Sequence, residues 1–100
     1  MFTLSSDENL LTFTLQRERS QFGDGSRVLF WIDKEQHVLQ RGRQEAIPIA
    51  MIDGFGVEAG RLFCRMGDIK ITLHLDETAD AEALNQAAAD LAAFCDVGFD

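Results

Sequence analysis

The stretch "IKITLHLDETADAEALNQAAADLAAFCDV", residues 69–97, decides the fold class because its hydrophobic period changes partway along. Apolar and polar side chains alternate over residues 69–75, the pattern of a half-buried strand. The residues that this pattern turns inward are Ile69, Ile71, Leu73 and Leu75. Farther along, apolar side chains recur at spacings of three and four, which is typical of an amphipathic helix. We therefore expect a final strand followed by one C-terminal helix over about residues 79–97.

Upstream of this stretch, several short segments have the composition of strands, and turns rich in glycine or polar residues separate them. They are "LLTFTLQRE" (10–18), in which Leu11, Phe13 and Leu15 share one face, "RVLFWID" (27–33), "HVLQR" (37–41), "FGVEA" (55–59) and "RLFCRM" (61–66). A chain of 100 residues with 46% hydrophobic content can bury one core, so we expect a single domain, residues 1–100. The expected class is α+β and mostly β. Its strands, six to seven in number, would form an antiparallel bent sheet or a barrel over about residues 2–75, closed by the helix.

The segment "LQRGRQEAIPI", residues 39–49, allows two interpretations of Arg41-Gly42-Arg43. A turn between strands needs a residue that tolerates positive φ, and Gly42 meets that need. A phosphate-binding loop would add a helix N-terminus or further glycines, whereas here Glu45 and Pro48 follow. The sequence favours the turn.

Charge is distributed unevenly along the chain. Residues 1–75 carry ten acidic and nine basic side chains, whereas residues 76–100 carry seven acidic and no basic ones. An acidic field repels nucleic acid and anionic membrane surfaces, so we expect neither as a partner. No apolar run approaches the roughly 18 residues of a membrane-spanning helix, and "MFTLSSDENL" lacks the features of a secretory signal. A cytoplasmic location is expected.

The residues that most often carry chemistry do not form a motif. His37, Cys64, His74 and Cys95 show none of the paired spacings of zinc sites, and both cysteines lie in apolar contexts that suit buried, reduced thiols. A Cys-His hydrolase would need an exposed thiol beside a cation. We therefore expect no metal, no cofactor and no catalytic residue.

The order of elements, together with "VLFWIDKEQHVLQRGRQEAIPIAMIDGFGVEAGRLF" (28–63), resembles the pleckstrin-homology-like barrels of bacterial proteins. The resemblance covers about residues 10–97 and implies a bent meander closed at one end by a C-terminal helix. Relatives that bind inositol phosphates have a basic cluster on the first hairpin loop. The matching loop here, "QRERSQFGDGSR" (16–27), interrupts its arginines with Glu18 and Asp24, so headgroup binding does not carry over.

These observations favour a noncatalytic binding module for a protein or peptide, with small-molecule or lipid-headgroup binding at the barrel mouth as the alternative. A partner could add a strand to a sheet edge or bring a basic surface to the acidic helix. Two candidate partner-binding surfaces follow. The first is the loop with Arg17, Arg19, Phe22 and Arg27, and the second is the helix face with Asp80, Glu82 and Asp90.

Overall fold

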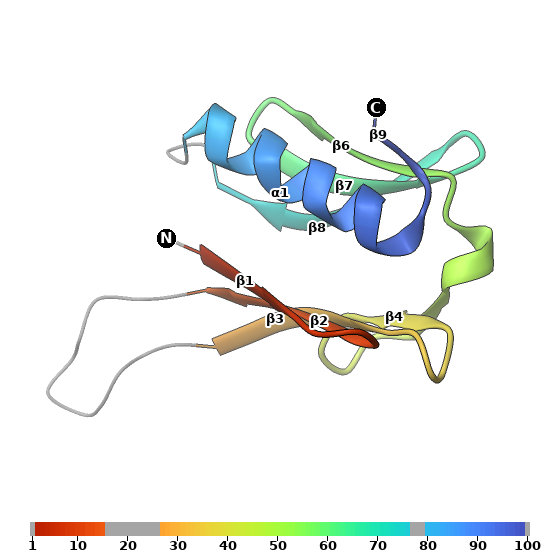
Figure 1. Cartoon of the computed structure of the whole chain (residues 1–100). Coiled ribbons are helices and arrows are strands. Elements are labelled where there is room, and N and C mark those ends of the chain that lie inside the picture. Colours follow the sequence, from red (N-terminus) through yellow and green to blue (C-terminus); the bar gives the residue numbers. More distant parts are fainter. Residues whose placement is uncertain (1, 16–26, 77–79, 100) are drawn as a thin grey trace, which may run out of the picture. The chain divides into compact units, whose positions relative to one another are not determined.

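A computed structural model of the chain describes residues 2–15, 27–76 and 80–99. Strands dominate these residues, and one α-helix lies near the C-terminus (Figure 1). The described strands form two sheets and no closed barrel. The α+β, mostly β class with a C-terminal helix is therefore confirmed, and the barrel is not.

The chain divides into two compact units, Met1–Ile47 and Pro48–Asp100, which we describe separately. The sheet of the first unit is a meander in which each strand neighbours the next in sequence. Its strands are β1 (Phe2–Ser6), β2 (Leu10–Leu15), β3 (Arg27–Asp33), β4 (Val38–Gln40) and β5 (Ile47–Pro48), the last of which reaches into the second unit.

The core of the first unit contains a stack of three aromatic rings. Phe13 on β2 stacks against Phe2 on β1 and Phe30 on β3, with ring centroids 4.9 and 4.8 Å apart. Phe13 and Phe30 are fully buried, and for Phe13 the alternation in the sequence of β2 predicts this. Offset aromatic pairs contribute packing energy beyond the area that they bury.

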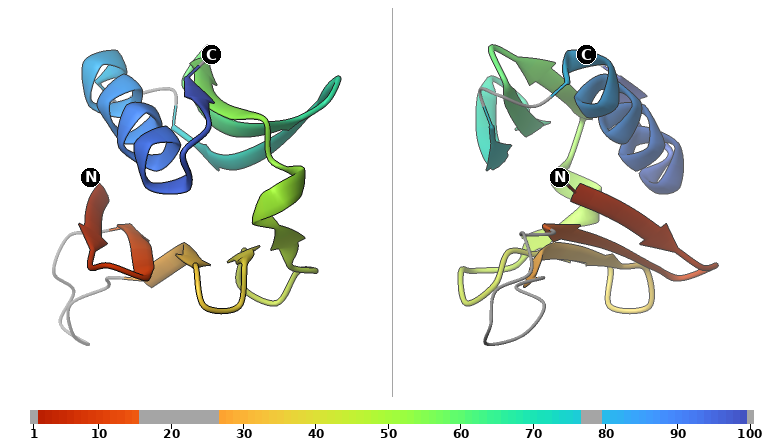
Figure 2. Two further views of the ribbon diagram at one scale, coloured as in Figure 1. Left: turned by 45° about the vertical axis from the view of Figure 1, so that its right-hand side comes forward. Right: turned by 90° about the vertical axis from the view of Figure 1, so that its left-hand side faces the viewer.

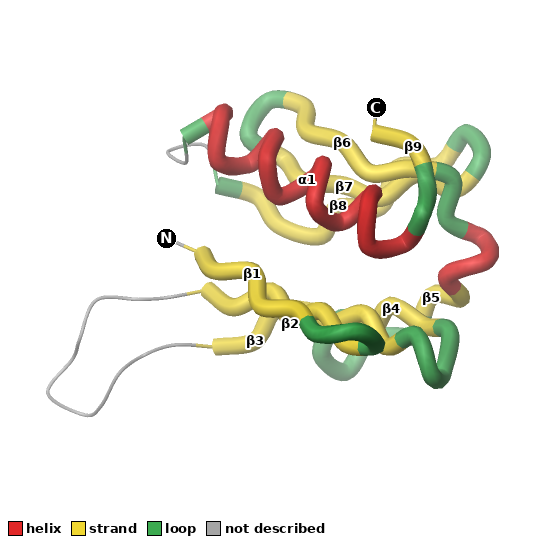
Figure 3. The backbone as a smooth tube through the Cα atoms, in the orientation of Figure 1, coloured by secondary structure: helices red, strands yellow, loops and turns green. Residues whose placement is uncertain are grey.

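The turn at Arg41-Gly42-Arg43 is confirmed. Gly42 has φ of 56°, and the N–H of Gln44 donates to the carbonyl of Arg41 at 3.0 Å. The side-chain amide of Gln40 donates to the carbonyls of Gly42 and Gln44, at 3.0 and 2.5 Å. The next strand, β5, begins only at Ile47, three residues after Gln44 (Figure 3).

The second unit holds a short 3-10 helix, η1 (Ile49–Met51), and a second sheet of four strands in the order β8-β7-β6-β9. Its strands are β6 (Gly54–Glu58), β7 (Arg61–Met66), β8 (Ile69–Leu75) and β9 (Gly98–Phe99). Two-residue turns join the first three. Ala59 and Gly60 both have positive φ, as type I′ turns require, and Gly67 alone does so in the next turn, as type II′ turns require.

The helix α1 (Ala81–Cys95) connects β8 to β9 and packs against β6 and β9 (Figure 2). Its buried side chains are Leu84, Ala87, Ala88, Leu91 and Ala92. Phe94 and Cys95, which the helical spacing also places on the apolar face, are only partly buried. Asp80 is the N-cap and accepts a hydrogen bond from the N–H of Glu82 at 3.0 Å, while Asp96 ends the helix in a left-handed conformation.

The expected inward face of β8 is partly wrong. Ile69 and Leu75 are 61% and 58% exposed, whereas Ile71 and Leu73 are half-buried. The register shifts opposite Leu62 and Phe63, so Leu73 is an extra residue in β8 and the alternation does not continue through it. β8 is also an edge strand of its sheet, where side chains near the strand ends have fewer neighbours.

Candidate functional site

The register of the second sheet assigns side chains to its two faces, because residues directly opposite each other on paired strands share a face. Phe55 pairs with Cys64 and Val57 with Leu62. Phe55, Leu62 and Cys64 are fully buried, so this face belongs to the core. The opposite face carries Glu58, Arg61, Phe63, Arg65 and Lys70, which we call the basic face.

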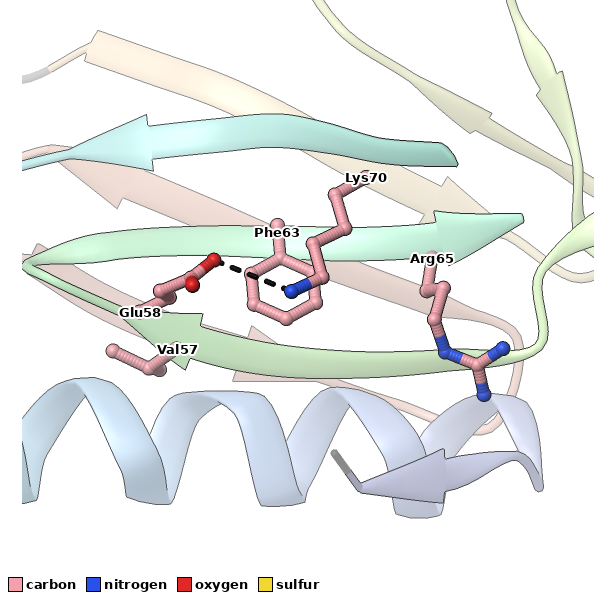
Figure 4. A pocket seen from close by; sticks show the side chains of 5 residues that line it. All are labelled: Val57, Glu58, Phe63, Arg65 and Lys70. Carbon is pink, nitrogen blue, oxygen red and sulfur yellow. Dashed lines mark hydrogen bonds and ion pairs between the residues drawn. The ribbon is translucent and has the colours of Figure 1, made fainter. Parts of the chain in front are cut away.

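One carboxylate oxygen contacts two cations on the basic face. Glu58 Oε2 lies 3.3 Å from Lys70 Nζ and 3.9 Å from a terminal nitrogen of Arg61. The same two cations lie over the ring of Phe63, with Lys70 Nζ 4.9 Å and Arg61 Cζ 5.6 Å from the ring centroid. Phe63 is only 3% exposed, so its ring forms an apolar floor beneath charged groups (Figure 4). Cations are attracted to the face of an aromatic ring.

A shallow depression of about 400 Å³ lies on this face, lined by Val57, Glu58, Phe63, Arg65 and Lys70. Arg65 donates to the carbonyl of Gly67 at 3.2 Å. Gly56 lies opposite Phe63 in the register and is buried. The depression therefore combines an apolar floor with a polar, mostly cationic rim.

The basic face concentrates the positive charge of its half of the chain. Residues 48–100 contain ten acidic and three basic residues, and all three basic ones, Arg61, Arg65 and Lys70, lie on this face. The net charge of the whole chain does not describe the electrostatic potential near these three side chains. Anionic groups can thus be attracted here although the net charge of the chain is −8.

The loop surface predicted from the sequence lies largely outside the described residues, since Arg17, Arg19 and Phe22 fall within 16–26. Arg27 is the first residue of β3 and is exposed.

The helix surface is described in full. Asp80 caps α1, Glu82 is exposed in its first turn, and Asp90 accepts a hydrogen bond from Gln86 Nε2 at 3.0 Å. All three are exposed. Asp80 and Asp90 accept hydrogen bonds within the helix, which is a structural role that needs no binding partner. Binding by either predicted surface stays a prediction.

The thiols and imidazoles do not converge. Cys64 is buried and Cys95 partly buried, and the two do not form a disulfide. Burial lowers the pKa of His74 from its ordinary value of 6.5, and the nearby Asp76 carboxylate opposes that shift only in part. Among the described residues, no group of three or more His, Cys, Asp or Glu side chains could hold a metal ion. No described helix has the length and apolarity to cross a membrane.

Sequence reasoning missed the basic face, although part of its signal was available. Arg61, Phe63 and Arg65 alternate within "RLFCRM" and must share one face of a strand. Lys70 and Glu58 join this face only through the register of the β6-β7 and β7-β8 hairpins. No local pattern in the sequence encodes that register. Comparison with protein-family models, curated proteins and solved structures found no match to this chain, so the pleckstrin-homology-like resemblance stays an expectation.

Proposed function

We propose that this protein is a noncatalytic binding module that takes an extended, acidic segment of a partner protein as an added strand along β8. The observation that carries the proposal is the position of β8 at the end of its sheet, where no other described strand pairs with it on its outer side. This strand of seven residues ends the order β8-β7-β6-β9, and Ile69 and Leu75 on it are largely exposed. Exposed edge strands with apolar side chains are templates for pairing with another chain.

The hydrogen-bonding groups that would hold the segment follow from the turn before β8. A two-residue turn at Gly67-Asp68 makes Met66 and Ile69 a hydrogen-bonded pair of the hairpin. Pairs alternate along an antiparallel ladder, so Lys70 and Thr72 direct their backbone N–H and C=O groups away from β7. These two residues supply the main-chain contacts.

The chemistry of the partner follows from the side chains beside this edge. Residues of an added strand would alternate between the basic face, next to Lys70 and Arg65, and the opposite face, next to Ile69 and Ile71. Acidic residues suit the first face and apolar residues the second. The extra residue at Leu73 disrupts the ladder, so the pairing covers about Ile69–Thr72 and the recognised segment is short.

The proposal is tested by selecting from a displayed library of random peptides against the full chain. Selected sequences should alternate acidic and apolar residues. On binding one of them, the amides of Lys70 and Thr72 should exchange hydrogen more slowly, whereas those of Ile69 and Ile71, already bonded to β7, should change little. Thr72→Pro removes the outward N–H and also fixes φ at this position, so its fold is checked by circular dichroism. The folded variant should not bind, while the matched Thr72→Val variant keeps that N–H and should bind normally. Selected peptides that bind Thr72→Pro as well as the parent would refute strand addition.

A further inference from the structure

We propose that the basic face is a binding site for a phosphate monoester, and that Glu58 is its internal occupant in the unliganded protein. The position of the anion is marked by Glu58 Oε2, which lies 3.3 Å from Lys70 Nζ and 3.9 Å from Arg61. A phosphate oxygen in that place would meet the same two cations. Arg65 lines the depression and adds a third positive charge at its rim.

The ion pair between Glu58 and Lys70 is weak enough for a ligand to displace the Glu58 carboxylate. The side chains of Glu58 and Lys70 are 60% and 42% exposed, and exposed ion pairs of this kind contribute little stability. Glu58 comes from the end of β6, next to the turn at Ala59-Gly60, so its side chain can swing into solvent without a change in the sheet. Arg61 Nε is buried and makes no hydrogen bond, so this guanidinium retains a donor that Glu58 does not satisfy.

The charge of the ligand follows from the same competition. A ligand with a single carboxylate would replace one carboxylate by another, and Glu58 has the advantage of a high effective concentration because it is tethered to the site. A phosphate monoester carries about −1.5 to −2 charge at neutral pH and three acceptor oxygens. It can therefore contact Arg61 and Lys70 together and still leave an oxygen directed toward Arg65, which a carboxylate cannot do.

The depression has room for a phosphate together with part of the molecule that carries it. Its volume of about 400 Å³ lies in the range of small-molecule pockets, so the phosphate would occupy only part of the space above the ring of Phe63. The anion would lie above the ring, between the two cations whose contacts with the face of Phe63 help to hold them in place. This site is on the sheet face and does not depend on a strand added at the edge of β8.

The test measures the affinity of the full chain for glycerol 3-phosphate, for a blocked phosphoserine peptide and for its unphosphorylated form, by following backbone amide shifts in NMR titrations. Shifts should be centred on Arg61, Phe63 and Lys70. Binding of both phosphorylated ligands would mean that the site recognises the phosphate group alone. Binding of the peptide alone would mean that the site recognises a phosphorylated side chain of a protein. Acetate should bind too weakly to measure.

Three variants distinguish specific phosphate binding at the basic face from a general effect of the charge of the chain. Glu58→Gln removes the competitor and should tighten phosphate binding by about threefold to fivefold. Glu82→Gln makes the same chemical change on helix α1 and should leave the affinity within about twofold, whereas Lys70→Gln should weaken it at least fivefold. Equal effects of Glu58→Gln and Glu82→Gln, or failure of both phosphorylated ligands to bind the parent chain, would overturn the proposal.

Discussion

Leu91 offers the sharpest test of how the second unit is held together. Its side chain is fully buried on α1, and together with Leu84 it is one of the two large residues on the buried face of a helix that packs on β6 and β9. Leu91→Ala removes the equivalent of about three methylene groups, worth roughly 2.4 kcal/mol of burial. An unrelaxed cavity of roughly 50 Å³ adds about 1 kcal/mol. We expect the free energy of unfolding to fall by about 3 kcal/mol.

The measurement is chemical denaturation followed by far-UV circular dichroism, because α1 is the single α-helix of the described residues and dominates the helical signal. For a chain of this length, a loss of about 3 kcal/mol corresponds to a fall in the thermal midpoint of roughly 12–24 °C. Asn85→Ala changes an exposed position of the same helix and should alter stability by less than about 0.5 kcal/mol. A loss below about 1 kcal/mol for Leu91→Ala would refute the packing described for α1.

Three further predictions follow from single residues. Gly42→Val should cost about 1–2 kcal/mol in denaturation experiments through its φ of 56° alone, because no atom lies within 4 Å of the added Cβ, and an unchanged midpoint would contradict the turn geometry. Burial lowers the pKa of His74, so the folded state disfavours its protonation; stability should be full above pH 6.5, the ordinary value, and should decline as the pH falls below it. This decline should be smaller in His74→Asn, and an identical decline in both proteins would exclude His74 as its source. Cys64 should react with a thiol reagent only on unfolding, whereas the partly buried Cys95 should react in the native state, and equal native rates would contradict their different burial.

The sequence predicted the elements well where one pattern dominated. The strand period of "LLTFTL" and the helical spacing of Leu84 to Leu91 both correspond to observed elements, because burial of one face requires those periods. The glycine at position 42 predicted its turn because few other residues tolerate positive φ. In each case the cause is local, within a few residues of the pattern.

Predictions failed or fell short where the cause lies between strands. The exposure of Ile69 and Leu75 depends on the bulge at Leu73 and on the edge position of β8, neither of which the alternation of its own residues encodes. The basic face has the same origin. Glu58 pairs with Arg61 across the β6-β7 hairpin and contacts Lys70 of β8, so the cluster depends on the registers of two hairpins and does not appear in any contiguous motif.

The two-residue turn at Gly67-Asp68 determines more than the direction of the chain. Successive side chains of a strand point to opposite faces, so one residue inserted or deleted in this turn would move Lys70 to the face that carries the buried Cys64 and would bring Ile71 out. Substitutions of Lys70 would weaken the basic face gradually, but a change of turn length would abolish it in one step. In descendants or relatives that retain the site, the spacing between Phe63 and Lys70 should therefore be invariant even where the residues between them vary.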